Sequence, residues 1–545
     1  MVQHDEVDVV IVGSGGAGLA AALAAAEQGA SAVVVEASGQ AGGTFAYSAG
    51  LVWVPNNHLM EGAGYSDSGE EALSHIRGLS GGRHDDVVLR TFIDRSPGVI
   101  RWLMDVMHVP FEVVVGYPDY YADRLGGKDG GRYIAAPVFP AIELLPPEWA
   151  SRLASSPHFA GLPASWAEIN SWGGLASMAS WDWEALARRF SSDCRAFGSA
   201  IIGFMLAECL ARKVDIRLNC RATELLTEHG AVVGIKTVDE SGAASDIWAK
   251  KGVLLATGGY DSNQELKKRY DSYPATIGIG SPGVDGSGIT MALELGAGFE
   301  VLDGQIMTPC YLIPGEEADG RPLYRSAVRE PAFPGGIVVN AAGKRFSDES
   351  FFRHLCQEMS RFDVISQNYP NEKAYFIFDE EWKQSYSLGP ISPGETPPWL
   401  VNAGSPGELA LQLGIDGASF ETTVETYNGN ADQGIDPEFH RGSTLYGRHT
   451  GDSRVQPNPC IRALKGRLYA IDLHIASSGT NNGLMFNSYG QVLHVKGNPI
   501  PGLYAAGNVA ANTVEGFWIN SGSSNAKSLT FGYLAVEHML GAARP

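Results

Sequence analysis

Three glycines and one acidic residue near the start of the chain have the types and spacing of a dinucleotide-binding turn. Gly13, Gly15 and Gly18 give the pattern G-x-G-x-x-G, and Glu36 ends the next apolar run. The first glycine permits a tight turn, the second lets the backbone approach a pyrophosphate, and the third lets a helix pack closely on a strand. A carboxylate at this distance accepts hydrogen bonds from ribose hydroxyls. The pattern alone leaves NAD and FAD open, and an ordinary βαβ unit is the alternative.

The flanking sequence supplies the elements that must position these residues. The apolar run 7–12 predicts a buried parallel strand, the alanine-rich sequence after Gly18 favours a helix, and 32–35 predicts a second strand. The N-terminus of such a helix offers free N–H groups and a positive dipole end to phosphates.

Later segments share this strand-and-glycine character. The glycine-rich stretch 39–50 can lie against a cofactor. Residues 252–260 and 502–508 each predict a strand that ends in a glycine turn. A last helix over about 523–541 could point its N-terminus at a cofactor ring.

The composition changes between about 272 and 450, where prolines, loops and charges increase. This change predicts an inserted second domain. We therefore expect the first part of one domain over 1–271, the inserted domain over 272–450, and the remainder of the first domain over 451–545.

The bulk composition excludes several classes of function. Of 545 residues, 44% are hydrophobic and 19% charged, which is ordinary for a soluble protein. The net charge of −21 argues against nucleic acid as a partner. The six cysteines form no C-x-x-C pair, so reduced thiols and no metal are expected. No integral membrane segment is expected because the uncharged stretch 196–207 is too short to cross a bilayer, and with no targeting peptide visible a cytoplasmic enzyme is expected.

Five of the eleven tryptophans lie between residues 149 and 183, with prolines and serines among them. Their spacing is not that of a helical stripe. A mobile cover, an oligomer contact and the aromatic packing of an irregular excursion are all open interpretations.

Taken together, these motifs resemble the FAD-dependent fumarate reductase/succinate dehydrogenase flavoprotein superfamily along nearly the whole chain. The resemblance is carried by residues 13–18, 42–44, 256–259, 335–349 and 502–508. It implies non-covalent FAD and an α/β fold, in which a Rossmann-like FAD-binding domain of the GR2 type carries an inserted α+β substrate or cap domain.

The resemblance also implies which residues bind the cofactor. The expected FAD-binding set is Gly13, Gly15, Gly16, Ala17, Gly18, Glu36, Ala37, Gly42, Gly43, Thr44, Ser48, Gly50, Ala222, Ala256, Thr257, Gly258, Gly507, Asn508, Ser523 and Ser524.

Within the superfamily the chain resembles the 3-ketosteroid dehydrogenases. Residues 43–55 are similar to their segment after the dinucleotide motif, and Pro118-Asp119-Tyr120 matches a motif whose tyrosine lies in their active site. Such enzymes remove two hydrogens from adjacent carbons beside a ketone, one as a hydride to the flavin N5 and one as a proton to a tyrosine. Tyr120 is thus the implied acid/base, with a packed loop tyrosine as the alternative.

Two departures from the family pattern concern the active site. Arg353 stands where the ketosteroid enzymes have a second tyrosine and the fumarate reductases an arginine that donates a proton. It could carry a proton, support Tyr120, or form a salt bridge to Asp348 or Glu349. His354 is a weaker candidate.

The second departure lies just before the last helix, where the family pattern is Y-P-G-P-G. This chain keeps Gly522 but has no tyrosine there. Gly522, with Ser521 or Asn520, is the expected donor set for the ketone oxygen, because an enolate develops on that oxygen. Trp518 is expected to be a wall of the substrate site.

The leading hypothesis is an FAD oxidoreductase that acts on a CH–CH bond beside the carbonyl of an apolar, cyclic or steroid-like ketone, in either direction, with an unidentified electron acceptor or donor. The alternatives are a fumarate-reductase-like enzyme that reduces an unsaturated carboxylate and a non-catalytic flavin-binding protein.

Overall fold

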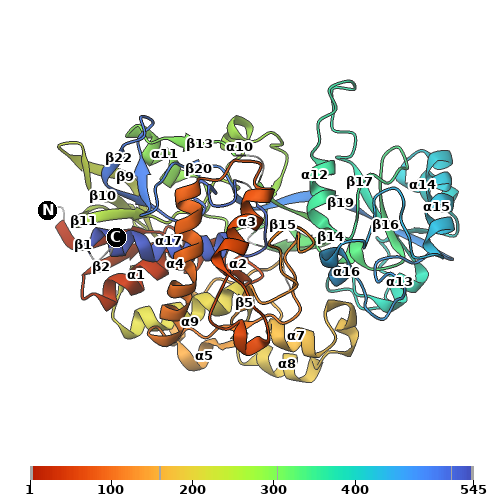
Figure 1. Ribbon diagram of the computed structural model, residues 1–545, viewed down its shortest axis with the longest axis horizontal. Coiled ribbons are helices and arrows are strands. Elements are labelled where there is room, and N and C mark those ends of the chain that lie inside the picture. The colour runs from red at the N-terminus through yellow and green to blue at the C-terminus, as the bar shows by residue number, and fades with distance from the viewer. Residues whose placement is uncertain (1–3, 159–160, 303–304, 319, 517, 542–545) are drawn as a thin grey trace.

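The glycine turn lies at the carboxyl end of β1, in the middle of a mostly parallel sheet (Figure 1). The structure is a computed structural model that describes residues 4–158, 161–302, 305–318, 320–516 and 518–541. The order of the sheet is β21-β22-β11-β1-β2-β8, with β10 and β9 continuing from β11 as an antiparallel hairpin. The strands are β1 His4–Val12, β2 Ala32–Val35, β8 Asp215–Arg217, β9 Cys220–Glu228, β10 Ala231–Asp239, β11 Ala244–Leu255, β21 Gln491–Leu493 and β22 Pro499–Ala505.

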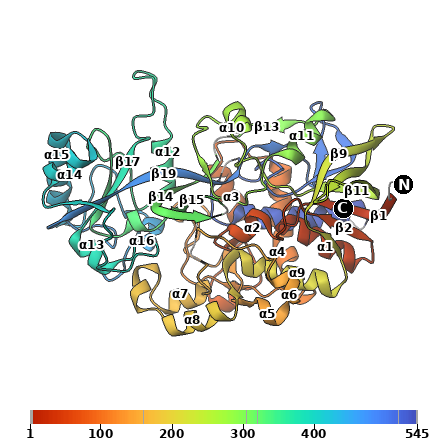
Figure 2. The ribbon, with the colours of Figure 1, turned by 180° about the vertical axis from the view of Figure 1, so that it is seen from behind.

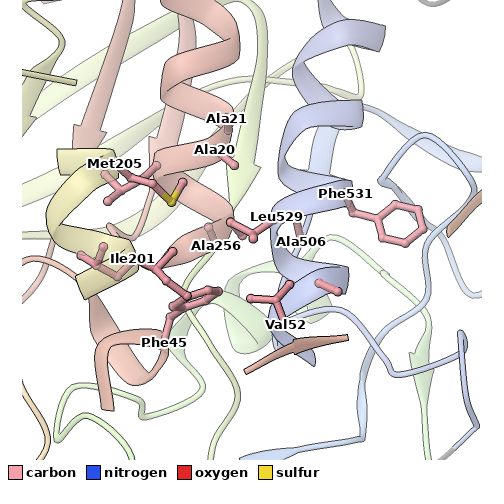
Figure 3. Close-up of a cluster of buried hydrophobic side chains, with 14 of the residues drawn as sticks. Ala20, Ala21, Phe45, Val52, Ile201, Met205, Ala256, Ala506, Leu529 and Phe531 are labelled. Carbon is pink, nitrogen blue, oxygen red and sulfur yellow. The ribbon is translucent and has the colours of Figure 1, made fainter. Parts of the chain in front are cut away.

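Two helices pack on this sheet, α1 (Gly16–Glu27) and α17 (Ser523–Met539), and a third, α9 (Phe197–Ala211), packs on α1. Five alanines of α1 (Ala20, Ala21, Ala22, Ala24 and Ala25) are fully buried, and their small side chains let α1 pack against both α9 and α17. Figure 3 shows α1 between the other two helices, with Met205 of α9 on one side of Ala20 and Leu529 of α17 on the other. The predicted strand–helix–strand unit and the last helix are confirmed.

A second, mostly antiparallel sheet lies at the opposite end of the molecule from β1 (Figures 1 and 2). Its order is β15-β14-β19-β17-β16, with β12 and β18 also pairing with β19. The strands are β12 Ile277–Gly278, β14 Gln305–Ala318, β15 Arg321–Ser326, β16 Gly336–Asn340, β17 Ala374–Asp379, β18 Val401–Ala403 and β19 Leu468–Thr480. The expected domain boundaries stay a prediction; the central strand of this sheet, β19, lies after residue 450.

The segment between the glycine turn and α9 wraps one side of the cavity described below. Residues 69–105 form α3 (Gly69–Leu79) and α4 (Asp86–Asp105), each started by a side-chain cap. The short strand β5 (Tyr133–Ala135) follows and pairs with β3 (Val52–Trp53) and β4 (Glu112–Val113). The remaining short strands are β6 Phe139–Pro140, β7 Cys194–Arg195, β13 Phe299–Glu300 and β20 Gly483–Leu484.

The other helices are mostly short. They are α2 Gly43–Tyr47, α5 Ala141–Leu144, α6 Pro147–Ala150, α7 Trp166–Ser171, α8 Trp183–Ser191, α10 Gln264–Tyr270, α11 Ser287–Glu294, α12 Phe352–Met359, α13 Glu380–Ser385, α14 Pro406–Leu413, α15 Gly417–Ala431 and α16 Leu445–Thr450, with 3-10 turns at Glu61–Ala63, Leu175–Ser180 and Glu330–Ala332. Among the residues described, no helix combines the length and apolar character needed to cross a membrane.

Candidate active site

One continuous cavity of about 630 Å³ brings most of the predicted site residues together. It extends from the glycine turn after β1 to an aromatic cluster around Tyr120. The predicted residues that line it are Gly13, Gly15, Gly16, Ala17, Glu36, Ala37, Gly43, Thr44, Ser48, Tyr120, Ala222, Ala256, Thr257, Gly258, Gly507, Asn508, Trp518, Ser521, Gly522 and Ser524.

Five predicted residues lie behind this wall instead of lining it. Gly18 packs so closely on the turn that a Cβ there would lie 1.9 Å from the Gly13 carbonyl oxygen. The backbone N–H groups of Gly42 and Gly50 donate to serine hydroxyls at 3.2 Å. Ser523 donates to the carboxylate of Glu515, and Arg353 packs behind Trp518. Each of these positions supports the shape of the wall.

The glycine end of the cavity fits a ligand that carries phosphates and hydroxyls. Gly15 starts α1 with no side-chain cap, so the first N–H groups of the helix are left for a ligand. A Cβ on Gly15 would meet no atom closer than 3.7 Å and would fill the space in front of the helix end. Glu36 is held beside the turn because its carboxylate accepts hydrogen bonds from Ser14 Oγ at 2.8 Å and the Ser38 N–H at 2.9 Å.

Asp261 is a cavity residue that sequence reasoning missed. It is 1% exposed, and neither carboxylate oxygen has a hydrogen-bond partner among the described residues. The hydroxyl of Thr257, also in the wall, has none either. Burial raises the pKa of Asp261 to about 7. Its position directly after the predicted strand and glycine turn at 252–260 was an available signal, since ligands bind at the carboxyl ends of parallel strands.

Tyr120 is held in an aromatic cluster at the other end of the cavity. Its side chain is 4% exposed, and its ring lies 4.5 Å from that of Tyr446, 5.7 Å from Phe352 and 5.9 Å from Trp518. Burial raises the pKa of Tyr120, while a hydrogen bond with Ser521 and the positive charge of Arg353 act to lower it. Tyr120 is therefore both tightly packed and part of the cavity wall.

The preceding residue, Asp119, fixes the loop that carries Tyr120. Its carboxylate accepts hydrogen bonds from Arg132 Nη1 at 2.7 Å and from Trp53 Nε1 at 2.8 Å. Arg132 is fully buried and also binds Asp67 through two nitrogens. In the motif Pro118-Asp119-Tyr120, buried Asp119 thus fixes the loop, and Tyr120 lines the cavity.

Arg353 stands at the start of α12 and contacts aromatic groups. Its Nη1 donates to Tyr121 Oη at 3.3 Å and to the Ile519 carbonyl at 3.4 Å, and its guanidinium lies 5.3 Å from the Trp518 ring centroid. The expected alternative of a salt bridge is wrong in the described part of the chain, because Glu349 pairs with Arg345 and no carboxylate lies within 4 Å of Arg353.

The other weaker candidates do not face the cavity. His354 Nδ1 accepts a hydrogen bond from the Asp348 N–H at 3.0 Å, which is a local structural contact. Asn520 is fully buried outside the cavity wall, so of the two alternative side-chain donors only Ser521 lines the cavity.

The backbone at position 522 requires glycine. It has φ of +73° at the start of α17, and a Cβ there would lie 2.5 Å from the Leu51 carbonyl oxygen. Its own carbonyl accepts from the Trp53 N–H at 3.2 Å. These contacts bind the loop before α17 to β3, next to the Asp119 anchor.

Two buried ionisable residues, Glu515 and Lys527, lie beneath this loop. The Glu515 carboxylate accepts from Ser523 Oγ at 2.7 Å and from the Ile519 N–H at 3.3 Å. Lys527, one turn into α17, donates to the Ala510 carbonyl at 3.1 Å. Burial raises the pKa of Glu515 to about 7 and lowers the pKa of Lys527 to about 7. No spacing pattern in the sequence indicates these two residues.

The tryptophan-rich segment forms one side of the cavity. Trp166, Trp181 and Trp183 line it, and Trp172 packs on Trp181 with ring centroids 5.6 Å apart. The tryptophans of this segment therefore pack on one another and also cover one side of the cavity. That the segment is mobile, or that it forms an oligomer contact, stays a prediction.

Comparison with known proteins agrees with this geometry. A family model described as "FAD binding domain" matches residues 8–525. The chain belongs to the FAD-binding domain family. The predicted fold class and FAD as the cofactor are confirmed by this membership and by the structural neighbours below.

Relatives in this family share nearly the full length of the chain. A 3-oxosteroid 1-dehydrogenase of Mycobacterium tuberculosis is 32% identical, with 98% of each chain covered. A 4-oxocyclohexanecarboxylate 2-dehydrogenase of Sinomonas cyclohexanicum is also 32% identical, covering 98% of this chain and 93% of that protein. The crystal structure of 3-ketosteroid delta1-dehydrogenase from Sterolibacterium denitrificans, in complex with 1,4-androstadiene-3,17-dione, superposes with a TM-score of 0.91 at 29% identity, covering 99% of this chain and 100% of that one. This FAD-binding-domain protein is an FAD-dependent oxidoreductase.

Proposed function

We propose that the chain catalyses α,β-dehydrogenation of a cyclic ketone. The observation that carries this proposal is that Tyr120, Ser521 and Gly522 line the same cavity as the glycine turn. One end of the cavity thus has the groups that suit a dinucleotide, and the other has an acid/base and hydrogen-bond donors. The relatives named as ketone dehydrogenases support the same reaction.

FAD, when bound along the glycine turn, supplies the acceptor for two electrons and one hydrogen of the substrate. Gly15 and the N-terminus of α1 are placed to bind its phosphates, and Glu36 its ribose hydroxyls. Asp261 offers an acceptor to further ligand hydroxyls, because both of its oxygens are unpaired in the described chain.

The substrate carbonyl is held at the start of α17. The backbone N–H of Gly522 and the Ser521 hydroxyl donate to the carbonyl oxygen, where negative charge grows as the α-carbon is deprotonated. Loss of one such donor typically costs a few kcal/mol of transition-state stabilisation. The contact of Gly522 with Leu51 keeps this donor in place.

Tyr120 carries the proton. In dehydrogenation two C–H bonds break: one hydrogen leaves with both electrons of its bond, and the other leaves as a proton to the Tyr120 oxygen, so that a C=C bond forms beside the carbonyl. In the reverse direction neutral Tyr120 returns that proton. Arg353 favours the anionic form of Tyr120 electrostatically, without lining the cavity itself.

Reduction of an unsaturated carboxylate is the second candidate. The observation that favours it is an arginine, Arg353, with no carboxylate within 4 Å among the described residues. Its place behind Trp518 argues against direct proton transfer to a ligand in the cavity.

Product analysis tests the proposed function. The holoprotein is incubated with a saturated cyclic ketone and an artificial electron acceptor, and the product is examined by mass spectrometry. A product lighter by two hydrogens, with the C=C bond conjugated to the carbonyl, is expected. Conversion of enoates by the chemically reduced protein, with no turnover of ketones, would favour the second candidate. A protein that binds FAD and converts neither substrate class would be a non-catalytic flavoprotein.

A further inference from the structure

Arg329, one of the arginines that line the cavity, has no acidic partner among the described residues. It lies between β15 and the 3-10 turn Glu330–Ala332, and it lines the cavity. Its Nη1 and Nη2 contact the His449 carbonyl and His449 Nε2, each at 3.3 Å, and its guanidinium lies 5.7 Å from the centroid of Tyr117. No carboxylate of the described chain lies within 4 Å of it.

The groups around Arg329 do not neutralise its charge. His449 is neutral, since burial and the positive charge of Arg329 lower its pKa to about 3. Glu330 turns instead toward Tyr311, whose hydroxyl donates to it at 3.2 Å, and burial raises the pKa of Glu330 to about 7.

Arg325, in the same cavity wall, shows the contrasting arrangement. Its Nε and Nη2 bind the two oxygens of Glu316 at 2.7 and 2.9 Å. Among the described residues, the fold therefore supplies a forked carboxylate partner to Arg325 and none to Arg329. The donors of a guanidinium match a carboxylate in the same forked geometry.

Arg329 stands across the aromatic cluster from the acid/base. Tyr117 packs on Arg329, Tyr446 lies 6.5 Å from Tyr117, and Tyr120 lies 4.5 Å from Tyr446. Tyr117 and Tyr120 both line the cavity. A ring held at Tyr120 can thus direct a substituent toward Arg329.

We infer that Arg329 binds a carboxylate of the substrate, so that the substrate is a cyclic ketone acid and not a neutral ketone. The inference rests on the proposed function for the ketone and on Arg329 alone for the acid. A hydrogen-bonded ion pair of this kind separates the acid from a neutral analogue of the same shape by roughly 10- to 100-fold in affinity.

Two pairs of compounds test the inference with the holoenzyme. Binding of cyclohexanecarboxylate and cyclohexanecarboxamide, which have no ketone, is measured by calorimetry. Flavin reduction is measured with 4-oxocyclohexanecarboxylate and its carboxamide. Wild type should prefer each acid by at least about tenfold. Arg329→Gln should remove most of that preference, whereas Arg325→Gln, in which the arginine engaged by Glu316 is changed, should keep it.

The acid-to-amide ratio is internal to each protein, so a general loss of activity does not affect it. Equal affinity of wild type for acid and amide, or a preference that survives Arg329→Gln, would overturn the inference. Arg329-dependent acid binding without any reduction of flavin by ketones would support the carboxylate site and overturn the proposed function. If Arg329→Gln does not retain FAD, Arg329→Lys is used in its place. Because lysine keeps the charge but lacks the forked donors of the guanidinium, acid binding should weaken severalfold. Unchanged acid binding in Arg329→Lys would count against the inference.

Discussion

At the residue scale the proposed chemistry depends on the protonation of Tyr120, on which burial and nearby positive charge have opposite effects. Burial favours the neutral phenol, whereas Ser521, Arg353 and Arg329 favour the phenolate. Burial is the largest of these influences, so the pKa of Tyr120 lies above its ordinary value of about 10. The residue is therefore a proton donor as it stands and becomes a base only as the pH rises.

Replacing Tyr120 tests its role most simply. Tyr120→Phe removes the hydroxyl and keeps the ring that packs on Tyr446. Flavin reduction by an active ketone should slow by about 10²- to 10⁴-fold, the usual contribution of a positioned acid or base. FAD content should not change, since Tyr120 lies at the other end of the cavity. Tyr121→Phe, which loses only the hydroxyl that accepts from Arg353, is the matched control and should retain most of the rate.

The pH dependence follows from the raised pKa of Tyr120. The rate constant for flavin reduction should increase with pH from about 6 to 10 without a plateau, because the phenolate fraction grows throughout this range. Arg353→Met removes a positive charge that favours the phenolate, so its rates should be lower at each pH. Anaerobic stopped-flow measurements across this range decide the matter; a plateau below pH 8 would show that another group is the base.

Asp261 predicts a pH-dependent stability of the apoprotein. Burial raises the pKa of Asp261 from 3.8 to about 7. Between these two pH values, Asp261 is protonated in the folded protein but ionised in the unfolded chain. The contribution of Asp261 to the stability of the folded apoprotein is fully present below pH 4 and is lost as the pH rises through about 7. Asp261→Asn should therefore stabilise the apoprotein more at pH 8 than at pH 5, and should weaken FAD binding. Thermal unfolding of both apoproteins at the two pH values measures the first effect; a stabilisation independent of pH would contradict it.

At the element scale the site is built from loops that the short strand β3 and helix α17 hold in place. The loop with Tyr120 is tied to β3 through Asp119 and Trp53, and the loop before α17 is tied to β3 through Gly522 and Trp53. The two halves of the expected active site thus share one short strand. A change in either anchor displaces a catalytic group that it does not touch.

Asp119→Asn tests this coupling. Arg132 is fully buried and would keep only Asp67 as a charged partner, so the free energy of unfolding should fall, by up to about 3–5 kcal/mol. The rate of ketone oxidation should fall as well, because the loop no longer fixes Tyr120. Asp129→Asn, an exposed change nearby, should alter stability by less than about 0.5 kcal/mol. Denaturant unfolding and steady-state kinetics provide the comparison; full activity in a destabilised Asp119→Asn protein would rule out the positioning role.

The cofactor end could be predicted from the sequence because its signals are local. The spacing of Gly13, Gly15 and Gly18 and the strand before them lie within one short segment. The substrate end could not be predicted in the same way, because Arg329 acquires meaning only from its place in the cavity wall and from the absence of an acidic partner among the described residues. Those properties arise from contacts between distant parts of the chain.

At the scale of the whole molecule, the two sheets have separate tasks. The parallel sheet and α1 build the cofactor end, whereas β15 and the segment after it bring Arg325 and Arg329 to the substrate end. The cavity between them is lined by the groups proposed to activate the ketone and, at its far end, by Arg325 and Arg329. Membership in the FAD-binding domain family accounts for the cofactor end of the cavity, and the chain's own residues define the substrate end.

Anaerobic mixing of the FAD-loaded protein with saturated cyclic ketones, followed by the visible absorbance of the flavin, tests the central claim most directly. At least one ketone should bleach the flavin of the wild type, with the carboxylated ketone most effective, and bleaching should be slowed by about 10²-fold or more in Tyr120→Phe. An unbleached flavin with every ketone, or equal bleaching in wild type and Tyr120→Phe, would contradict this claim.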